Sequence, residues 1–189
     1  MPSAEPAPTA RGGSLRRVAR EAIEWGLREG GEPRVDLTRH EPEQRRPGAS
    51  FVTLRRQGEL RGCTGSLEPT RPLVEDVAQN AWRSANRDPR FSPLEADELA
   101  DLEISVCVLS SLEPVRVGSA QELLERLRVG VDGLVLREGA RRATFLPSVW
   151  EGLSEPRAFL EALLQKAGLP PGYWSPSLRF ERYTTRDAP

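Results

Sequence analysis

The sequence is poor in the residues that build disulfides, metal sites and membrane spans. Its 189 residues include one histidine and two cysteines, Cys63 and Cys107, and no stretch approaches the roughly 18 apolar residues that a membrane helix needs. The N-terminal residues also lack the apolar segment of a secretory signal. Two cysteines in dissimilar contexts do not make a disulfide framework. We therefore expect a cytoplasmic protein that does not associate with membranes.

Common catalytic and cofactor motifs are absent as well. The chain has no Cys-x-x-Cys or His-x-x-x-His spacing, so the lone His40 does not complete a zinc site. It has no Gly-x-Gly-x-x-Gly after a predicted strand, no Walker-type loop and no Gly-x-Ser-x-Gly elbow. We expect no metal site and no resident cofactor, and the sequence argues against the common nucleotide-binding folds and serine hydrolases.

A surplus of positive charge is also missing, because the formal net charge is −1. A general nucleic-acid binder uses a positive field to gather phosphates. Lys166 is the only lysine among 27 basic residues, and an arginine preference this uniform indicates codon bias more than a demand for guanidinium chemistry. The motive for RNA binding is limited to three arginine pairs without a visible stacking platform: Arg45-Arg46, Arg55-Arg56 and Arg141-Arg142. Nucleic acid is therefore not the expected partner.

What is present is enough apolar material for a core, 38% of residues, with 29% charged. Residues 1–13 are rich in Pro, Ala and Gly and are expected to form a disordered tail. We expect one domain over residues 14–185, with residues 186–189 as a second tail. The length suits one domain or two tightly joined subdomains.

Apolar residues at helical spacing predict four helices. The expected boundaries are Ser14 and Gly30-Gly31, Thr70 and Asp88-Pro89, Ser119 and Leu127, and Ser154 and Gly168. Pro72 is expected in the first turn of the second helix, Trp82 on its apolar stripe, and Ser119 with Glu122 in a capping box. Residues 32–48, which contain His40, are expected to form a long surface loop.

Short β-prone runs predict two hairpins and two further strands. The expected strands are 51–56 and 59–63 around Gln57-Gly58, 102–109, 134–137 and 141–146 around Glu138-Gly139-Ala140, and 178–183. The run 102–109 is expected as a central strand, with Cys107 on the face opposite its alternating apolar residues. Hairpins mixed with helices, without a β-α-β rhythm, favour an α+β fold whose mixed sheet is largely antiparallel and has flanking helices.

The segment Leu60-Arg61-Gly62-Cys63-Thr64-Gly65 is the first candidate site. Two glycines allow a sharp turn whose backbone N–H groups form an anion-receptive concavity, and Arg61 adds positive charge, so that Cys63 is a candidate reactive thiolate. The structural alternative, which we favour, has Gly for the turn, Arg61 in a surface ion pair and Cys63 as a small buried filler.

The second candidate site is Asp88-Pro89-Arg90-Phe91 at the end of the second helix. Asp88 is a candidate base, or it holds Arg90 in a charge-assisted pair, and the pairing role is the more common one at a helix end. Asn80 and Ser84 lie off the apolar stripe, and they face a cleft or, as we favour, solvent.

Together these segments resemble the AMMECR-domain family. The match covers roughly residues 14–185 and rests on landmarks that follow the family's order and spacing: Phe51-Val-Thr-Leu, Gly58-x-Leu-Arg-Gly-Cys-Thr-Gly-Ser, Asp88-Pro-Arg-Phe, Glu98-Leu99, Ile104-Ser-Val-Cys-Val-Leu-Ser, Gly130-x-Asp132-Gly133-Leu134, Phe145-Leu-Pro and Lys166-Ala-Gly-Leu. The family's usual motif is Leu-Arg-Gly-Cys-Ile-Gly, so Thr64 departs from it. The resemblance implies a two-subdomain α+β fold with this motif beside a cleft. It also implies, in prokaryotes, association with a Memo-like protein and a radical SAM enzyme, but no settled activity.

Two functions remain in competition. In the first, the chain is an enzyme or enzyme component whose cleft binds a small anionic substrate. Its candidate catalytic residues are Arg61, Cys63 and Asp88, and its candidate ligand-binding residues are Gly62, Thr64, Gly65, Asn80 and Arg90. In the second, the chain is a non-catalytic adaptor that uses the same surface to dock the Memo-like and radical SAM proteins. The reactivity of the thiols separates the two.

Overall fold

The computed structural model describes residues 14–188, and the expected tail over residues 1–13 lies outside them. The described chain divides into two compact units, residues 14–109 with 186–188 and residues 110–185. Each unit has helices, an antiparallel sheet and its own apolar core, which confirms the expected α+β class. No helix among residues 14–188 is long and apolar enough to cross a membrane.

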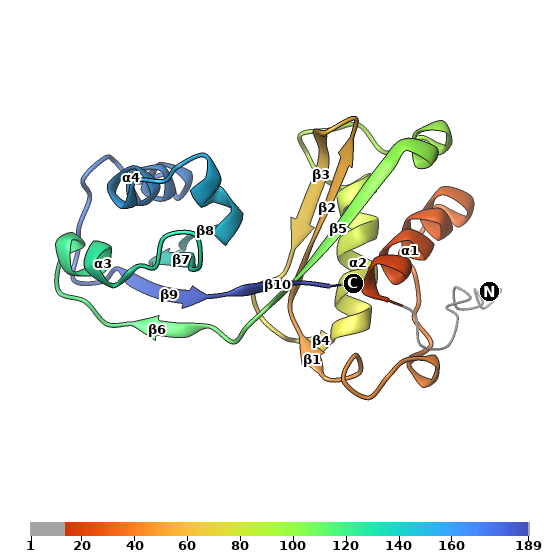
Figure 1. Ribbon diagram of the computed structural model, residues 1–189, viewed down its shortest axis with the longest axis horizontal. Coiled ribbons are helices and arrows are strands. Elements are labelled where there is room, and N and C mark those ends of the chain that lie inside the picture. Colours follow the sequence, from red (N-terminus) through yellow and green to blue (C-terminus); the bar gives the residue numbers. More distant parts are fainter. Residues whose placement is uncertain (1–13, 189) are drawn as a thin grey trace. The chain divides into compact units, whose positions relative to one another are not determined.

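The first unit packs helices against one four-stranded sheet (Figure 1). Its elements are α1 (Leu15–Glu29), η1 (Leu37–Arg39), β1 (Pro47–Gly48), β2 (Ser50–Arg56), β3 (Glu59–Gly65), β4 (Arg71–Pro72), α2 (Leu73–Asn86), η2 (Ala96–Asp101), β5 (Leu102–Leu109) and β10 (Thr185–Asp187). The main sheet has the order β10-β5-β2-β3, with β2 antiparallel to both neighbours. The expected strand 102–109 is thus confirmed as an inner strand.

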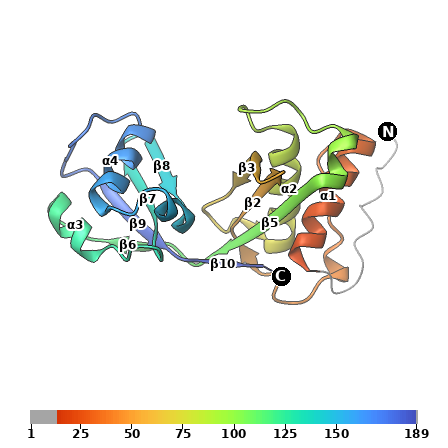
Figure 2. The same ribbon diagram turned by 45° about the horizontal axis from the view of Figure 1, so that its top comes forward.

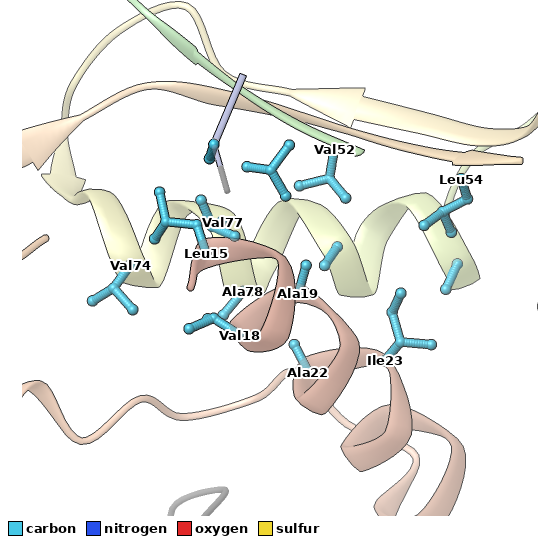
Figure 3. Packing of buried hydrophobic residues seen from close by; sticks show 14 of the residues in the cluster. Leu15, Val18, Ala19, Ala22, Ile23, Val52, Leu54, Val74, Val77 and Ala78 are labelled. Atoms are coloured by element: carbon cyan, nitrogen blue, oxygen red, sulfur yellow. The ribbon is translucent and has the colours of Figure 1, made fainter. Parts of the chain in front are cut away.

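Helices α1 and α2 cover one face of this sheet. Val52 and Leu54 of β2 are completely buried and point toward apolar side chains of both helices, including Ile23 and Val77 (Figure 3). The predicted ends of α1 are confirmed, because Ser14 Oγ accepts the Arg17 N–H and Gly30 adopts a left-handed conformation. The opposite face of the sheet presents the alternate residues of each strand.

The chain after residue 185 returns to the first unit. The expectation of a tail at residues 186–189 is wrong for residues 186–188, because β10 lies next to β5 in the sheet (Figure 1). The Ala188 N–H donates to the Val106 carbonyl at 2.8 Å, and Ala188 is 1% exposed. A strand of three residues carries too short a pattern to be recognised in a sequence.

The predicted hairpin around Gln57-Gly58 is confirmed as a two-residue connection between β2 and β3. Both residues have positive φ, 53° at Gln57 and 81° at Gly58, as the favoured two-residue turn between twisted strands requires. The pairing register shifts between Leu54 and Arg55, and the extra residue on β3 is Arg61. This bulge changes the direction of the Arg61 side chain relative to a regular ladder.

Two expectations in the first unit need correction. Helix α2 begins at Leu73, so Pro72 and not Thr70 occupies the N-cap position. No side chain forms a capping hydrogen bond there. The segment 32–48 contains η1 and β1, and His40 is 2% exposed, with its Nδ1 3.3 Å from Gln44 Oε1. Burial lowers the pKa of His40, so this histidine is a neutral packing residue, although most of the segment 32–48 is exposed loop as expected.

The second unit has a four-stranded sheet with the order β6-β9-β7-β8 and a helical layer on one face (Figure 2). Its elements are β6 (Glu113–Val115), α3 (Ala120–Arg126), β7 (Gly133–Glu138), β8 (Arg141–Phe145), η3 (Pro147–Glu151), α4 (Pro156–Lys166) and β9 (Arg179–Tyr183). The expected second hairpin is confirmed as β7 and β8, and the expected strand 178–183 is confirmed as β9. The N-cap of α4 is Glu155 instead of Ser154. The Ser119 half of the expected capping box is confirmed, because Ser119 Oγ accepts the Glu122 N–H, whereas the Glu122 carboxylate accepts the Gly118 N–H instead of the Ser119 N–H.

Candidate functional site

The expected strand 59–63 is confirmed as β3, and it continues to Gly65 as an edge strand instead of turning sharply at the two glycines. This strand pairs with β2 on one side only, and Gly62 and Gly65 do not have positive φ. The prediction that the glycines form a concavity of backbone N–H groups is therefore wrong. The N–H groups of this segment lie in a strand instead of converging on one point.

The two glycines are required by close packing. A Cβ atom at Gly62 would lie 2.2 Å from the carbonyl oxygen of Ser84, so α2 crosses directly over this position. A Cβ atom at Gly65 would lie 2.3 Å from the ring of Phe51 on the other face of the sheet. Thr64, between them, is half-buried and pairs with Val52. The glycines shape the surroundings of Cys63 without binding anything through their own backbone geometry.

Cys63 points to the sheet face opposite α1 and α2. It pairs with Thr53, which in turn pairs with Ser105, and its sulfur lies 3.3 Å from Thr53 Oγ1. Cys107 lies on the same face, two strands away. We call these side chains, together with Phe51, the thiol face: Phe51, Thr53, Cys63, Ser105 and Cys107 are all half-buried. Both cysteines are free thiols.

The two thiols have different surroundings. Cys107 Sγ donates to Asp187 Oδ1 at 3.1 Å, a contact made by the C-terminal strand. Burial, and then the Asp187 carboxylate, raise the pKa of Cys107 to about 12. Cys107 is therefore a neutral thiol at pH 7. The Cys63 sulfur, in contrast, contacts the Thr53 hydroxyl and forms no hydrogen bond with a carboxylate among residues 14–188.

Asp88 and Arg90 bind the free backbone edge of Cys63. Asp88 Oδ2 accepts the Cys63 N–H at 2.9 Å, and Arg90 Nη2 donates to the Cys63 carbonyl at 3.4 Å. Arg90 also forms a two-pronged pair with Asp88, Nε to Oδ1 at 2.9 Å and Nη2 to Oδ2 at 2.6 Å. These contacts satisfy the outward N–H and C=O of an edge strand, which otherwise invites another chain to pair.

The same contacts fix the charge of Asp88. The Arg90 hydrogen bonds are the largest of several influences that lower the pKa of Asp88 to about 2. Asp88 therefore stays ionised near neutral pH and does not exchange protons there. The arrangement matches the pairing role considered from the sequence and makes Asp88 a weaker base than an ordinary aspartate.

Arg61, expected beside the thiol, is bound elsewhere. Its Nε and Nη2 donate to the two carboxylate oxygens of Glu98, both at 2.8 Å, and Nη1 donates to the Ser92 carbonyl at 3.0 Å. Both side chains are largely buried, 14% exposed for Arg61 and 12% for Glu98. Arg61 hydrogen bonding lowers the pKa of Glu98 to about 2. The pair borders a hollow of about 320 Å³ at the end of the β2–β3 hairpin.

Asn80 and Ser84 are not solvent-facing, so the favoured interpretation is wrong for both. Asn80 Nδ2 donates to Asp76 Oδ2 at 2.9 Å and to the Ser50 carbonyl at 3.1 Å, and Asn80 is 2% exposed. Ser84 Oγ donates to the Val52 carbonyl at 2.8 Å. The buried Asp76 also accepts from Ser50 and Ser66. This network ties α2 to β2 and lies on the helix side of the sheet, away from Cys63.

Of the predicted site residues, the structure therefore brings together Cys63, Asp88 and Arg90. Glu98 and Asp76 carry polar networks that local pattern did not reveal. Glu98 was marked only by the family resemblance, and Asp76 resembles any acidic residue in a helix first turn. No three side chains of His, Cys, Asp or Glu within residues 14–188 converge as metal ligands.

Comparisons with known proteins agree with this fold. The AMMECR1 family model matches residues 16–188. A protein of Methanothermobacter thermautotrophicus is 39% identical over 183 residues, 94% of each chain, and one of Methanopyrus kandleri is 38% identical over 167 residues, 85% of this chain and 78% of its own. The crystal structure of an uncharacterized protein from Pyrococcus horikoshii has a TM-score of 0.85 at 34% identity, covering 92% of this chain and 88% of that one. The chain therefore belongs to the AMMECR1 family.

Proposed function

We propose that this protein is an enzyme component that binds a small anionic ligand at the thiol face, with Cys63 as the nucleophile and Arg90 as the cation. The observation that supports this most is the contact of Arg90 and Asp88 with both backbone polar groups of Cys63. This contact holds a guanidinium beside a free thiol. It also replaces Arg61 by Arg90 as the anion-binding residue, since Arg61 is occupied by Glu98.

The geometry of Arg90 suits this role. The Arg90 side chain is 53% exposed, and Asp88 bonds its Nε and Nη2, which orients the planar guanidinium. Within residues 14–188, Nη1 of Arg90 makes no hydrogen bond and is available to a ligand. A guanidinium held in this way suits carboxylate and phosphate groups, with which it forms charge-assisted hydrogen bonds.

Catalysis at this site would depend on the thiol itself. Asp88, with a pKa of about 2, and Cys107, with a pKa of about 12, both keep one protonation state near pH 7. The thiolate is the nucleophilic form of a cysteine, so the reaction would start from the deprotonated Cys63 sulfur. We also propose that the protein resides in the cytoplasm, because its two free thiols fit a reducing compartment.

A second candidate is the adaptor function, in which this surface docks the Memo-like and radical SAM proteins. The locked ion pairs favour it, because Asp88 and Glu98 are each neutralised by an arginine inside the chain. Carboxylates that are already paired with arginines stabilise the structure of a docking surface, and they are less suited to transferring protons.

Alkylation with two reagents tests the proposal. Iodoacetate is anionic and iodoacetamide is neutral, and in both cases the Cys63 thiolate displaces iodide. Arg90→Ala should lower the iodoacetate rate several-fold more than the iodoacetamide rate, because only the anionic reagent uses the guanidinium. Arg28→Ala, an exposed arginine at the end of α1, is the matched control and should leave the ratio of rates unchanged. Mass spectrometry of labelled peptides measures both rates.

Two results would contradict the proposal. If Cys63 stays unlabelled while the protein remains folded, the thiol is not available for chemistry. If Arg90→Ala leaves the iodoacetate-to-iodoacetamide ratio unchanged, Arg90 is not an anion-binding group. Either result favours the adaptor function.

A further inference from the structure

Four arginines lie in one row across the sheet of the second unit. Arg137 of β7 pairs with Arg142 of β8 on one side and with Arg179 of β9 on the other. Val115 of β6 pairs with Phe180 of β9. Because the two strands are antiparallel, the same register continued by one residue places Arg116 opposite Arg179. Residues directly opposite in an antiparallel sheet point to the same face. The row therefore runs through β6, β9, β7 and β8 on a single face.

This face is the one turned away from the core of the second unit. The neighbours of the four arginines along the strands are core residues: Val115, Leu136, Ala143 and Phe180 pack in or against the apolar cluster. Because side chains alternate along a strand, the arginines project to the opposite side. Arg116, Arg142 and Arg179 are exposed and Arg137 is half-buried.

The row carries more positive than negative charge. On the same face Glu181 is the only acidic residue of the four strands, and its Oε2 accepts from Arg137 Nε at 3.0 Å. Adjacent strands place opposite residues roughly 5 Å apart. Like charges held so close repel each other and destabilise a sheet. A sheet that carries this arrangement gains from an anion that bridges the row.

A hollow of about 590 Å³ lies along three members of the row, Arg116, Arg137 and Arg179. Its remaining lining is mostly apolar, with Val117 and Leu178, and also includes Glu181, the partner of Arg137. This volume falls in the range of small-molecule sites, which combine apolar walls with a few polar groups. The hollow is formed entirely by residues of the second unit.

We propose that this arginine row binds a small organic molecule that carries two or more phosphate groups, independently of the thiol face. The strand positions of Arg116, Arg179 and Arg137 span about 10 Å, which suits several linked phosphates better than one carboxylate. Within residues 14–188, Arg179 keeps its Nε and Nη2 for a ligand, while its Nη1 donates to the Pro176 and Leu178 carbonyls. The apolar wall takes the uncharged part of the ligand. A single-stranded nucleic acid fits less well, because its bases need exposed aromatic rings for stacking. The aromatic residue that the four strands place on this face is Tyr183, and it is only 1% exposed.

Calorimetric titration of the full chain with ATP and with pyrophosphate, both without magnesium, tests the assignment. ATP should bind, and pyrophosphate should bind more weakly because it has no apolar part. Arg116→Ala and Arg179→Ala should each weaken ATP binding about tenfold, the factor expected from losing one charge-assisted contact. The control Arg157→Ala removes an exposed arginine from α4 and should leave the affinity unchanged. Absence of ATP binding, or equal effects of Arg116→Ala and Arg157→Ala, would overturn the proposal.

Melting curves separate ligand binding from a structural role. Without ligand, Arg116→Ala should melt at the same or a higher temperature than the wild type, because it relieves repulsion. With ATP, the wild type should gain stability that Arg116→Ala does not. A lower melting temperature of unliganded Arg116→Ala would make the arginine structural and overturn the proposal. Tighter binding of a ten-nucleotide single-stranded RNA than of ATP would also overturn it.

Discussion

Replacing Arg61 with alanine should destabilise the first unit at pH 7 and should do so less as the pH falls. The reason is the Arg61–Glu98 pair, in which two hydrogen bonds of 2.8 Å join side chains that are less than 15% exposed. The pKa of Glu98 is lowered from an ordinary value of 4.5 to about 2, chiefly by these bonds. At 1.36 kcal/mol per pKa unit, the pair and its surroundings contribute about 3 kcal/mol.

The sign of the pH dependence follows from the direction of the pKa. A carboxylate whose pKa is lowered on folding stabilises the native state fully above its unfolded value, here about 4.5, and this contribution is lost as the pH falls toward 2. The difference in unfolding free energy between wild type and Arg61→Ala should therefore be largest at pH 6 to 7 and roughly halved near pH 3. Arg61→Lys should recover only part of it, because an ammonium group does not match both oxygens.

Urea denaturation at pH 7, 4 and 3 measures this difference. Arg55→Ala is the matched control, since Arg55 is an exposed arginine on β2 with a single bond to the Gly58 carbonyl, and its loss should cost less than about 1 kcal/mol. Arg61→Ala combined with Glu98→Gln should be less unstable than Arg61→Ala alone, because no buried charge is left unpaired. A penalty for Arg61→Ala that equals the Arg55→Ala penalty, or that does not change with pH, would refute the reasoning.

Three further substitutions or reactions test other parts of the structure. Cys63 should react with iodoacetamide faster than Cys107 at pH 7, because burial and Asp187 keep the Cys107 thiol neutral; equal labelling in the folded protein would contradict this. Trp82→Ala should cost about 3 to 5 kcal/mol, since Trp82 is 6% exposed between α1 and α2, and an unchanged melting temperature would show that the ring is not a core residue. Gly62→Ala should lower the melting temperature clearly more than the control Gly118→Ala, where the nearest atom to an added Cβ is 3.7 Å away; equal effects would mean that α2 yields to the methyl group.

Elements with local signals were predictable from the sequence. The N-cap Ser14, the stop at Gly30 and the turn Gln57-Gly58 each act through bonds or φ values within a few residues, and all three are confirmed. The strand 102–109 was predictable for the same reason, because its alternation spans eight residues. Caps and turns can be predicted from one sequence because their hydrogen bonds and backbone angles involve only neighbouring residues.

The candidate site was predictable only in part, because its contacts are distant in sequence. Arg61 and Cys63 are neighbours in the chain, yet Arg61 binds Glu98, 37 residues away. A glycine in a sequence does not reveal whether it serves a positive φ or close packing, and Gly62 turned out to serve packing against α2. Asn80 illustrates the same point, since only the position of β2 decides that it is buried.

The return of the chain to the first unit has a consequence for how the protein is made on the ribosome. The sheet of residues 14–109 is completed by β10, whereas the second unit is continuous over residues 110–185. During synthesis β5 therefore keeps one open edge until residues 185–188 emerge, directly after β9 of the second unit. The sheet whose strands are made first is thus among the last parts to be completed, and β5 is exposed to wrong pairing while the second unit is being made.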